Sequence, residues 1–170
     1  MKYAGMIFVV VSATSVGLKM SAYLRGRCRL IQQILTSLQI LRNEISVCGT
    51  PLPQAFALIA VSANGAVESL CAYIARAMDK NRWMTPLNAM EQGFRNDPAW
   101  KQEDRVCDIL CQCAAGLGKY DRPSQLQVID QAVDALSALL KQTEQEHNIR
   151  GKTYRILGIC AGLSMVILLA

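Results

Sequence analysis

The sequence predicts an all-α fold: a six-helix antiparallel bundle whose first and last helices continue into N-terminal and C-terminal transmembrane helices. Apolar residues recur at spacings of three and four along most of the chain, which is the periodicity of helices with one buried face. Hydrophobic residues make up 52% of the 170 residues but aromatic residues only 6%, a balance that favours helices over strands. Both ends of the chain are long apolar stretches.

These apolar ends predict the domain organisation. From Ile156 to the last residue no side chain is charged, and together with Tyr154 and Arg155 this run spans a thin bilayer core at about 1.5 Å per residue. The opposite end is apolar from Tyr3 to Leu24 if Lys19 extends its amine to the interface. We expect transmembrane helices at 1–24 and 153–170, separated by a helical domain at 25–152.

Small residues mark one face of the C-terminal span. Gly158 and Gly162 are four residues apart, so they lie one above the other on a helix and permit close packing against a second membrane helix. The chain's own first span is the expected partner, and packing between copies of the chain is the alternative.

The net charge of +5 is concentrated beside the two apolar ends. This position is typical of the cytoplasmic side of a membrane, so we expect the central domain to be cytoplasmic. The rest of the chain has ten basic residues against all 13 acidic ones and no basic stripe with interleaved aromatics, which argues against nucleic-acid binding. The eight flanking basic residues are Lys2, Lys19, Arg25, Arg27, Arg29, Arg150, Lys152 and Arg155.

The first bundle helix is expected at 24–47, where no proline interrupts the chain. Gly49 supplies a left-handed end to this helix, and Thr50 is expected to cap the next one, ahead of Pro51 and Pro53. The predicted buried stripe of the first helix consists of Ile31, Ile34, Leu38, Leu41 and Ile45.

Four further helices follow the same cap and breaker signals. We expect helices at 53–61 and 66–80, and a third that Thr85 and Pro86 open and that ends near Arg95. After a turn at 96–98, a helix beginning at Trp100 or Lys101 closes at 116–118. Asp121 is expected to cap the last helix, which continues through Lys152 into the terminal span.

Little in the sequence indicates catalysis, a cofactor or a metal. His147 is the single histidine and lies in a polar stretch, so Ser-His-Asp and Cys-His schemes are disfavoured. Cys107 and Cys111 share a helix face, but Cys113 lies about 200° from Cys111, so we expect packed small hydrophobic residues and no metal cluster. The odd total of seven cysteines fits reduced thiols in a cytoplasm. We expect a protein without enzymatic activity.

An ordered set of residues over nearly the whole chain resembles the stage III sporulation protein AB family of endospore-forming bacteria. No single motif is specific, but the order is. The residues are Glu44-Ile45, Thr50-Pro51-Leu52-Pro53 with Ala55, Glu103-Asp104, Leu117-Gly118 with Asp121 and Gln125, Gly158, and Val166-Ile167-Leu168.

The resemblance implies a role that the residue patterns alone do not. The family's cytoplasmic domain is similar to the helical-bundle domain of platform protein F of type II secretion and type IV pilus systems. The family belongs to a channel complex in the mother-cell membrane facing the forespore, together with the ATPase stage III sporulation protein AA and other membrane subunits. The expected function is a membrane scaffold that docks this ATPase to the platform, with self-association left open.

Candidate partner-interface residues are the polar side chains near predicted turns that we expect to be exposed: Glu103, Asp104, Asp121, Arg122 and Gln125. Alternatively, these side chains cap helices or form hydrogen bonds within turns, and this interpretation is favoured for Asp104 and Asp121. The alternative function is a small membrane protein whose bundle binds an apolar ligand or regulates another membrane protein.

Overall fold

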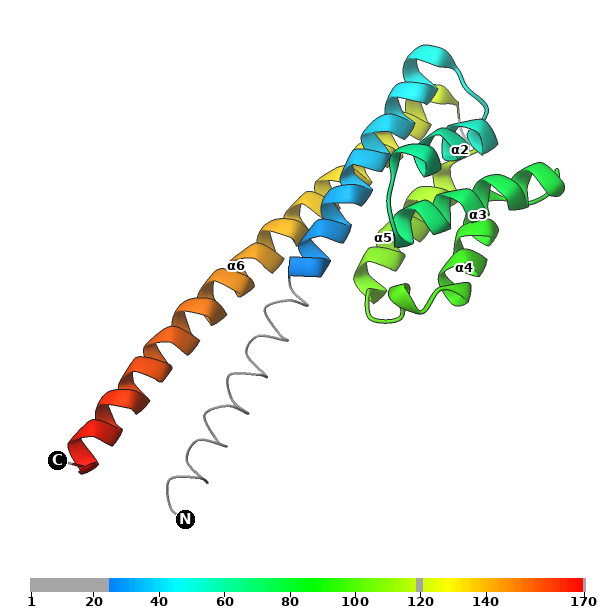
Figure 1. Cartoon of the computed structure of the whole chain (residues 1–170). Helices are drawn as coiled ribbons and strands as arrows, with labels where there is room; N and C mark the ends of the chain where they lie inside the picture. Colours follow the sequence, from blue (N-terminus) through cyan, green and yellow to red (C-terminus); the bar gives the residue numbers. More distant parts are fainter. Residues whose placement is uncertain (1–24, 119–120, 170) are drawn as a thin grey trace. The chain divides into compact units, whose positions relative to one another are not determined.

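The computed structural model describes residues 25–118 and 121–169, with side chains described as far as residue 145. These residues form six α-helices and no strand (Figure 1), which confirms the predicted all-α class. The antiparallel arrangement of the helices stays a prediction. The elements are a helix at 25–43, the π-turn η1 (Glu44–Cys48), α2 (Leu52–Ser62), α3 (Ala66–Lys80), α4 (Pro86–Asn96), the 3₁₀ turn η2 (Pro98–Trp100), α5 (Asp104–Gly116) and α6 (Arg122–Leu169).

The chain divides into two compact units. Leu30–Leu139 forms one, and the described residues 25–29 and 140–169 belong to the other. Among the described helices, none is both long and apolar enough to count as a membrane span. The predicted transmembrane helix at 1–24 lies outside the described residues, and the one at 153–170, like the boundaries of the central domain, stays a prediction. The predicted extension of the last helix through Lys152 is confirmed, because α6 is unbroken to Leu169.

The core of the Leu30–Leu139 unit follows the predicted apolar stripes. All five predicted residues of the first helix are buried, from Ile31 to Ile45. Consecutive helices pack on one another, α2 on α3, α3 on α4, and α4 on α5. The other helices contribute most of the buried side chains that their spacing predicts, among them Phe56, Ile59, Val67, Leu70, Ile74, Met90, Val106, Leu110, Ile129 and Leu136.

Of two threonines predicted to cap helices, Thr85 does so and Thr50 does not. Thr85 caps α4 as predicted, since its Oγ1 accepts a hydrogen bond from the Asn88 N–H at 3.2 Å. The prediction for Thr50 is wrong: α2 follows Pro51 without a side-chain cap. The Thr50 hydroxyl instead donates to Oε2 of Glu44 at 2.6 Å, because the left-handed Gly49, with φ of +63°, turns the chain back over η1.

The start of the fifth helix is also later than predicted. The Asp97 carboxylate accepts a hydrogen bond from the Ala99 N–H at 2.9 Å and so closes a separate turn, η2, in which Trp100 is buried. A second turn follows, in which the Glu103 N–H donates to the Trp100 carbonyl at 3.0 Å. The helix α5 therefore begins at Asp104 and not at Trp100 or Lys101.

Candidate interaction surface

The five predicted interface residues do not form one patch. Glu103 and Asp104 lie where α5 begins, whereas Asp121 and Arg122 lie where α6 begins, after α5 has ended. The 13 residues of α5 place its two ends about 18 to 20 Å apart at 1.5 Å per residue. The two sets are therefore separate candidates for binding a partner.

The expectation that the Glu103 side chain is exposed is wrong. Glu103 is only 4% exposed and has an interaction partner within the chain. Its backbone explains the burial: the N–H bonds to Trp100 and the carbonyl accepts from the Cys107 N–H at 2.9 Å, so the residue forms the inner side of the turn into α5.

Asp104 remains exposed at the first turn of α5. An acidic side chain there is favoured by the positive end of the helix dipole. Asp104 and Asp108 lie close enough to Cys107 to help raise the pKa of that thiol to about 11, although burial is the main cause and Cys111 the second. The start of α5 is thus an acidic surface around half-buried, uncharged thiols.

The start of α6 lies against the turn that follows η1. A methyl group at Gly49 would collide with the guanidinium group of Arg122, so these two segments, distant in sequence, lie side by side (Figure 1). Arg122 is exposed, and a cation beside the C-terminal end of the first helix is favoured by the helix dipole. Asp121 is also exposed, and its carbonyl accepts from the Gln125 N–H at 3.0 Å.

We call this place the Arg122 surface and define it by Val47, Cys48, Gly49, Asp121 and Arg122. Val47 is 75% exposed and Cys48 is also exposed. Gln125 borders the surface but is half-buried and has an interaction partner within the chain. The two neighbouring segments thus present an exposed apolar side chain, a carboxylate and a guanidinium, the mixed composition that protein interfaces show.

The prediction of interface residues missed large exposed apolar side chains. On α2, Leu58 is 48% and Val61 is 88% exposed, although Phe56 and Ile59 of the same helix are buried. The signal was present in the sequence, because the 11 residues of α2 include no charged residue and a helix that is apolar all round is normally covered. This face is a second apolar surface available to a partner.

Trp83 was missed as well. It is 92% exposed in the turn between α3 and α4, where the backbone N–H of Trp83 donates to Oδ1 of Asn81 at 3.1 Å. Lys80 and Arg82 beside it are exposed too. Trp and Arg are the residue types most enriched among side chains that dominate binding energy, and a tryptophan in a polar turn was the available signal.

The cysteines in the part of the chain that the structure describes are free thiols. No group of three or more His, Cys, Asp or Glu side chains there is placed to hold a metal ion. Cys113 is buried on the inner face of α5, whereas Cys107 and Cys111 are half-buried. Burial raises the pKa of both Cys71 and Cys113 to about 12, so these thiols are neutral core residues.

Gly158 and Gly162 both fall within α6. They lie beyond the part of that helix whose side chains are described. Their packing against another membrane helix stays a prediction.

Comparison with known proteins decides the family. A family model described as stage III sporulation protein AB matches residues 2–170. The chain belongs to the stage III sporulation protein AB family. A solved structure titled "Stage III sporulation protein AB (SpoIIIAB)" is 30% identical, with a TM-score of 0.63, over 70% of this chain and 94% of that one. No curated protein sequence matches the chain.

Membership of the stage III sporulation protein AB family confirms the resemblance drawn from the ordered residues. It gives the chain a role in sporulation and therefore indicates an endospore-forming bacterium. The family is not a known family of enzymes.

Proposed function

We propose that the chain is a non-catalytic scaffold subunit of a secretion-like channel complex between mother cell and forespore. Its segments 1–24 and 153–170 anchor it in the mother-cell membrane, and the helical domain between them docks the ATPase stage III sporulation protein AA to the membrane platform in the cytoplasm. The observation that carries the proposal is the family match over residues 2–170. The apolar ends and their flanking basic residues support the membrane placement.

The Arg122 surface is the proposed docking site for the ATPase. It combines the exposed charges of Asp121 and Arg122 with the exposed Val47, so a partner gains both apolar burial and charge-assisted hydrogen bonds there. At the start of α5, by contrast, burial of Glu103 leaves Asp104 as the accessible member of the predicted pair.

A binding measurement between the full chain and the ATPase, with and without ATP, tests this assignment. We expect saturable binding that Arg122→Glu weakens about tenfold or more, because it reverses the charge at the centre of the surface. Lys101→Glu is the matched control, since Lys101 is exposed near the other end of α5 and the change in net charge is identical. If the two variants lose the same amount of affinity, the docking site is not the Arg122 surface. If the unaltered chain does not bind the ATPase, the proposed docking function is wrong.

Asp121 allows the cap and contact roles to be separated. Asn is as good an N-cap residue as Asp but carries no charge. If Asp121 contacts the ATPase through its charge, Asp121→Asn weakens binding while the stability of the chain is unchanged. If Asp121 acts as a cap alone, Asp121→Asn binds normally and Asp121→Ala lowers stability.

A further inference from the structure

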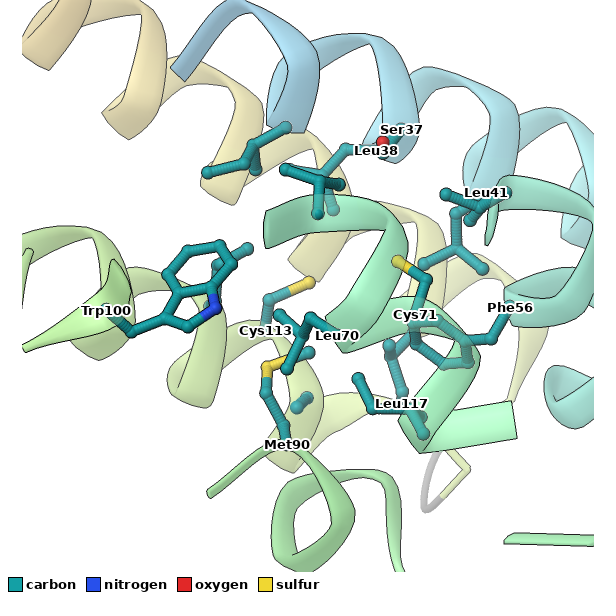
Figure 2. A pocket seen from close by; sticks show the side chains of 16 residues that line it. Ser37, Leu38, Leu41, Phe56, Leu70, Cys71, Met90, Trp100, Cys113 and Leu117 are labelled. Carbon is teal, nitrogen blue, oxygen red and sulfur yellow. The ribbon is translucent and has the colours of Figure 1, made fainter. Parts of the chain in front are cut away.

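The hollow in the core of the Leu30–Leu139 unit is too small for an organic ligand. Its walls are almost entirely apolar (Figure 2) and its volume is about 40 Å³, whereas a cavity that takes up benzene measures about 150 Å³. The hollow therefore has room only for water-sized groups. A site for a larger group has to lie at the surface.

A surface cleft between α3 and α4 is much larger. Its volume is about 320 Å³, about twice that of a cavity that takes up benzene. Leu70 and Gly93 are buried at its floor, where a Cβ atom on Gly93 would collide with Leu70. We call this hollow the α3–α4 cleft, and its walls include Leu70, Tyr73, Gly93, Asn96, Asp97 and Pro98.

The α3–α4 cleft offers an aromatic ring and a carboxylate oxygen. The ring of Tyr73 is held in place, because its hydroxyl donates to Oε1 of Gln92 at 3.0 Å. Asp97 is half-buried and its Oδ1 accepts from the Ala99 N–H, but no donor of the described residues reaches its Oδ2. An occupant that fits is therefore a flat, largely apolar group with a cation beside it.

The turn between α3 and α4 carries such a group. Trp83 is 92% exposed, and Lys80 and Arg82 are exposed and form no ion pair with the described residues. We call these three residues the Trp83 knob. The turn is already ordered, because Asn81 accepts from the backbone N–H of Trp83 at 3.1 Å and from that of Met84 at 2.9 Å. Little backbone freedom is therefore lost when the knob binds.

The knob does not fill the cleft of its own chain. At 1.5 Å per residue, the end of α3 at Lys80 lies about 10 Å beyond Tyr73, and the ring of Trp83 is exposed. Each chain thus has one knob and one cleft on the same pair of packed helices. Two copies related by a two-fold axis can fill both clefts at once.

We propose that two copies of this chain pair through α3 and α4, with Trp83 of each copy in the α3–α4 cleft of the other. The indole packs on the ring of Tyr73, and a cation of the knob pairs with Oδ2 of Asp97. Aromatic residues and arginine are the residue types enriched in such interfaces. The pairing is independent of ATPase docking, because neither the knob nor the cleft includes a residue of the Arg122 surface.

The area of this contact predicts its strength. One tryptophan buries about 150 to 250 Å², so two of them and the surfaces that receive them bury about 600 to 1,000 Å². Stable complexes bury about 1,200 Å² or more. We therefore expect a weak, reversible pair with a Kd above about 10 μM, which the proposed membrane anchors would favour by holding the copies at a high effective concentration.

Fluorine NMR on the full chain in a mild detergent tests the pairing. The chain has two tryptophans, so labelling with fluorinated tryptophan gives two signals, and Trp83→Phe identifies the signal of Trp83. Labelled chain is kept dilute while unlabelled chain is added at a constant detergent concentration. We expect the signal of Trp83 to move in a saturable way as its ring leaves water, while the signal of the buried Trp100 stays in place.

A variant with a filled cleft shows which surface receives the ring. Ser69 is exposed and lines the cleft, so Ser69→Tyr occupies the space and leaves the knob intact. When labelled and unlabelled chains both carry Ser69→Tyr, the signal of Trp83 should no longer move. Contact between two tryptophans, or between Trp83 and detergent, would persist in this variant.

A change of charge tests the part played by Asp97. Asn caps a turn as well as Asp does, so Asp97→Asn keeps the acceptor for the Ala99 N–H and removes only the charge. We expect this variant to weaken pairing about fivefold or more, because both contacts of the pair lose a charge-assisted hydrogen bond. Glu91→Gln is the matched control, since Glu91 is exposed on α4 outside the cleft, and it should pair normally.

The proposal is overturned if the signal of Trp83 in the unaltered chain does not move as chain is added. It is overturned as well if Ser69→Tyr moves the signal as much as the unaltered chain does. Should Ser69→Tyr fail to fold, equal affinities for Asp97→Asn and Glu91→Gln would overturn the assignment of the cleft.

Discussion

At the scale of single residues, the backbone at Gly49 is the tightest constraint beside the proposed docking site. Its φ of +63° is left-handed, a conformation that costs a residue with a Cβ atom about 1 to 2 kcal/mol. We expect Gly49→Ala to lower the free energy of unfolding by about that amount in a urea titration. The added methyl group would also displace the guanidinium group of Arg122 and so weaken ATPase binding.

Two comparisons separate backbone strain from collision at Gly49. The end of an arginine side chain moves easily, so the loss of stability should be nearly the same in an Arg122→Ala background. Gly26 lies in the first helix with no atom near its missing side chain, so Gly26→Ala should cost nothing or add up to about 1 kcal/mol. A stable Gly49→Ala variant would contradict the strained turn.

Buried thiols give the chain a pH dependence in the alkaline range. Cys71 and Cys113 keep their protons in the folded state up to a pKa of about 12, whereas the ordinary value is 9.0. The folded state therefore binds more protons than the unfolded state above pH 9, so stability falls as the pH rises from there towards 12. We expect a loss of about 1 kcal/mol per buried thiol between pH 9 and pH 10.

Urea titrations across this pH range measure the effect. Cys71→Val retains an apolar side chain of similar size but removes one ionisable group, so its stability should fall less steeply with pH. If Cys71→Val and the unaltered chain lose stability in parallel, the thiol of Cys71 is not the cause.

At the scale of elements, α5 and α6 approach each other closely at Gly116. A Cβ atom there would lie 2.9 Å from Cγ2 and 3.0 Å from Cγ1 of Val128, and a β-branched side chain has little freedom to move aside. We expect Gly116→Ala to destabilise the chain by about 1 to 3 kcal/mol through overpacking. The measurement is the free energy of unfolding in urea.

The partner residue supplies the control for Gly116. Val128→Ala removes both clashing atoms, so the double variant Gly116→Ala, Val128→Ala should be more stable than the sum of the two single losses predicts. If the two changes in the free energy of unfolding simply add in the double variant, the cost of Gly116→Ala does not come from the contact between α5 and α6.

The helices themselves were predictable because their signals are local. The cap and proline at Thr85 and Pro86 set the start of α4, and Gly49 ends the first helix, as the structure confirms. The errors arise where a polar side chain had more than one possible partner: Thr50 bonds back to Glu44, and Asp97 closes a turn ahead of α5. Neither choice is visible in the spacing of apolar residues.

The candidate sites were less predictable because they depend on contacts between distant segments. No local pattern shows that Glu103 is buried, that Arg122 lies against Gly49, or that Nε1 of Trp100 is buried without a hydrogen-bond partner. These features arise from the packing of helices on one another. The exposed face of α2 and the exposed Trp83 could have been predicted from the sequence. The residues of α2 include no charge, and Trp83 is a tryptophan in a polar turn.

At the scale of the whole molecule, the proposed membrane topology makes Cys48 a reporter. The basic residues beside both apolar ends favour a cytoplasmic domain, and Cys48 is an exposed thiol of that domain. We expect a membrane-impermeant maleimide to leave Cys48 unlabelled in intact cells and to label it after permeabilisation. Cys48→Ser identifies its share of the signal, and labelling of Cys48 in intact cells would place the domain on the other side.

The same thiol connects topology with docking, because Cys48 lies between Val47 and Gly49 on the Arg122 surface. If the ATPase covers this surface, adding it to the purified full chain should slow the labelling of Cys48 several-fold, while the half-buried Cys111 on α5 reacts as before. Arg122→Glu should abolish the protection of Cys48. A bound protein shields the thiols that it covers from the maleimide. If the ATPase protects Cys111 and not Cys48, the docking site is therefore the acidic surface at the start of α5.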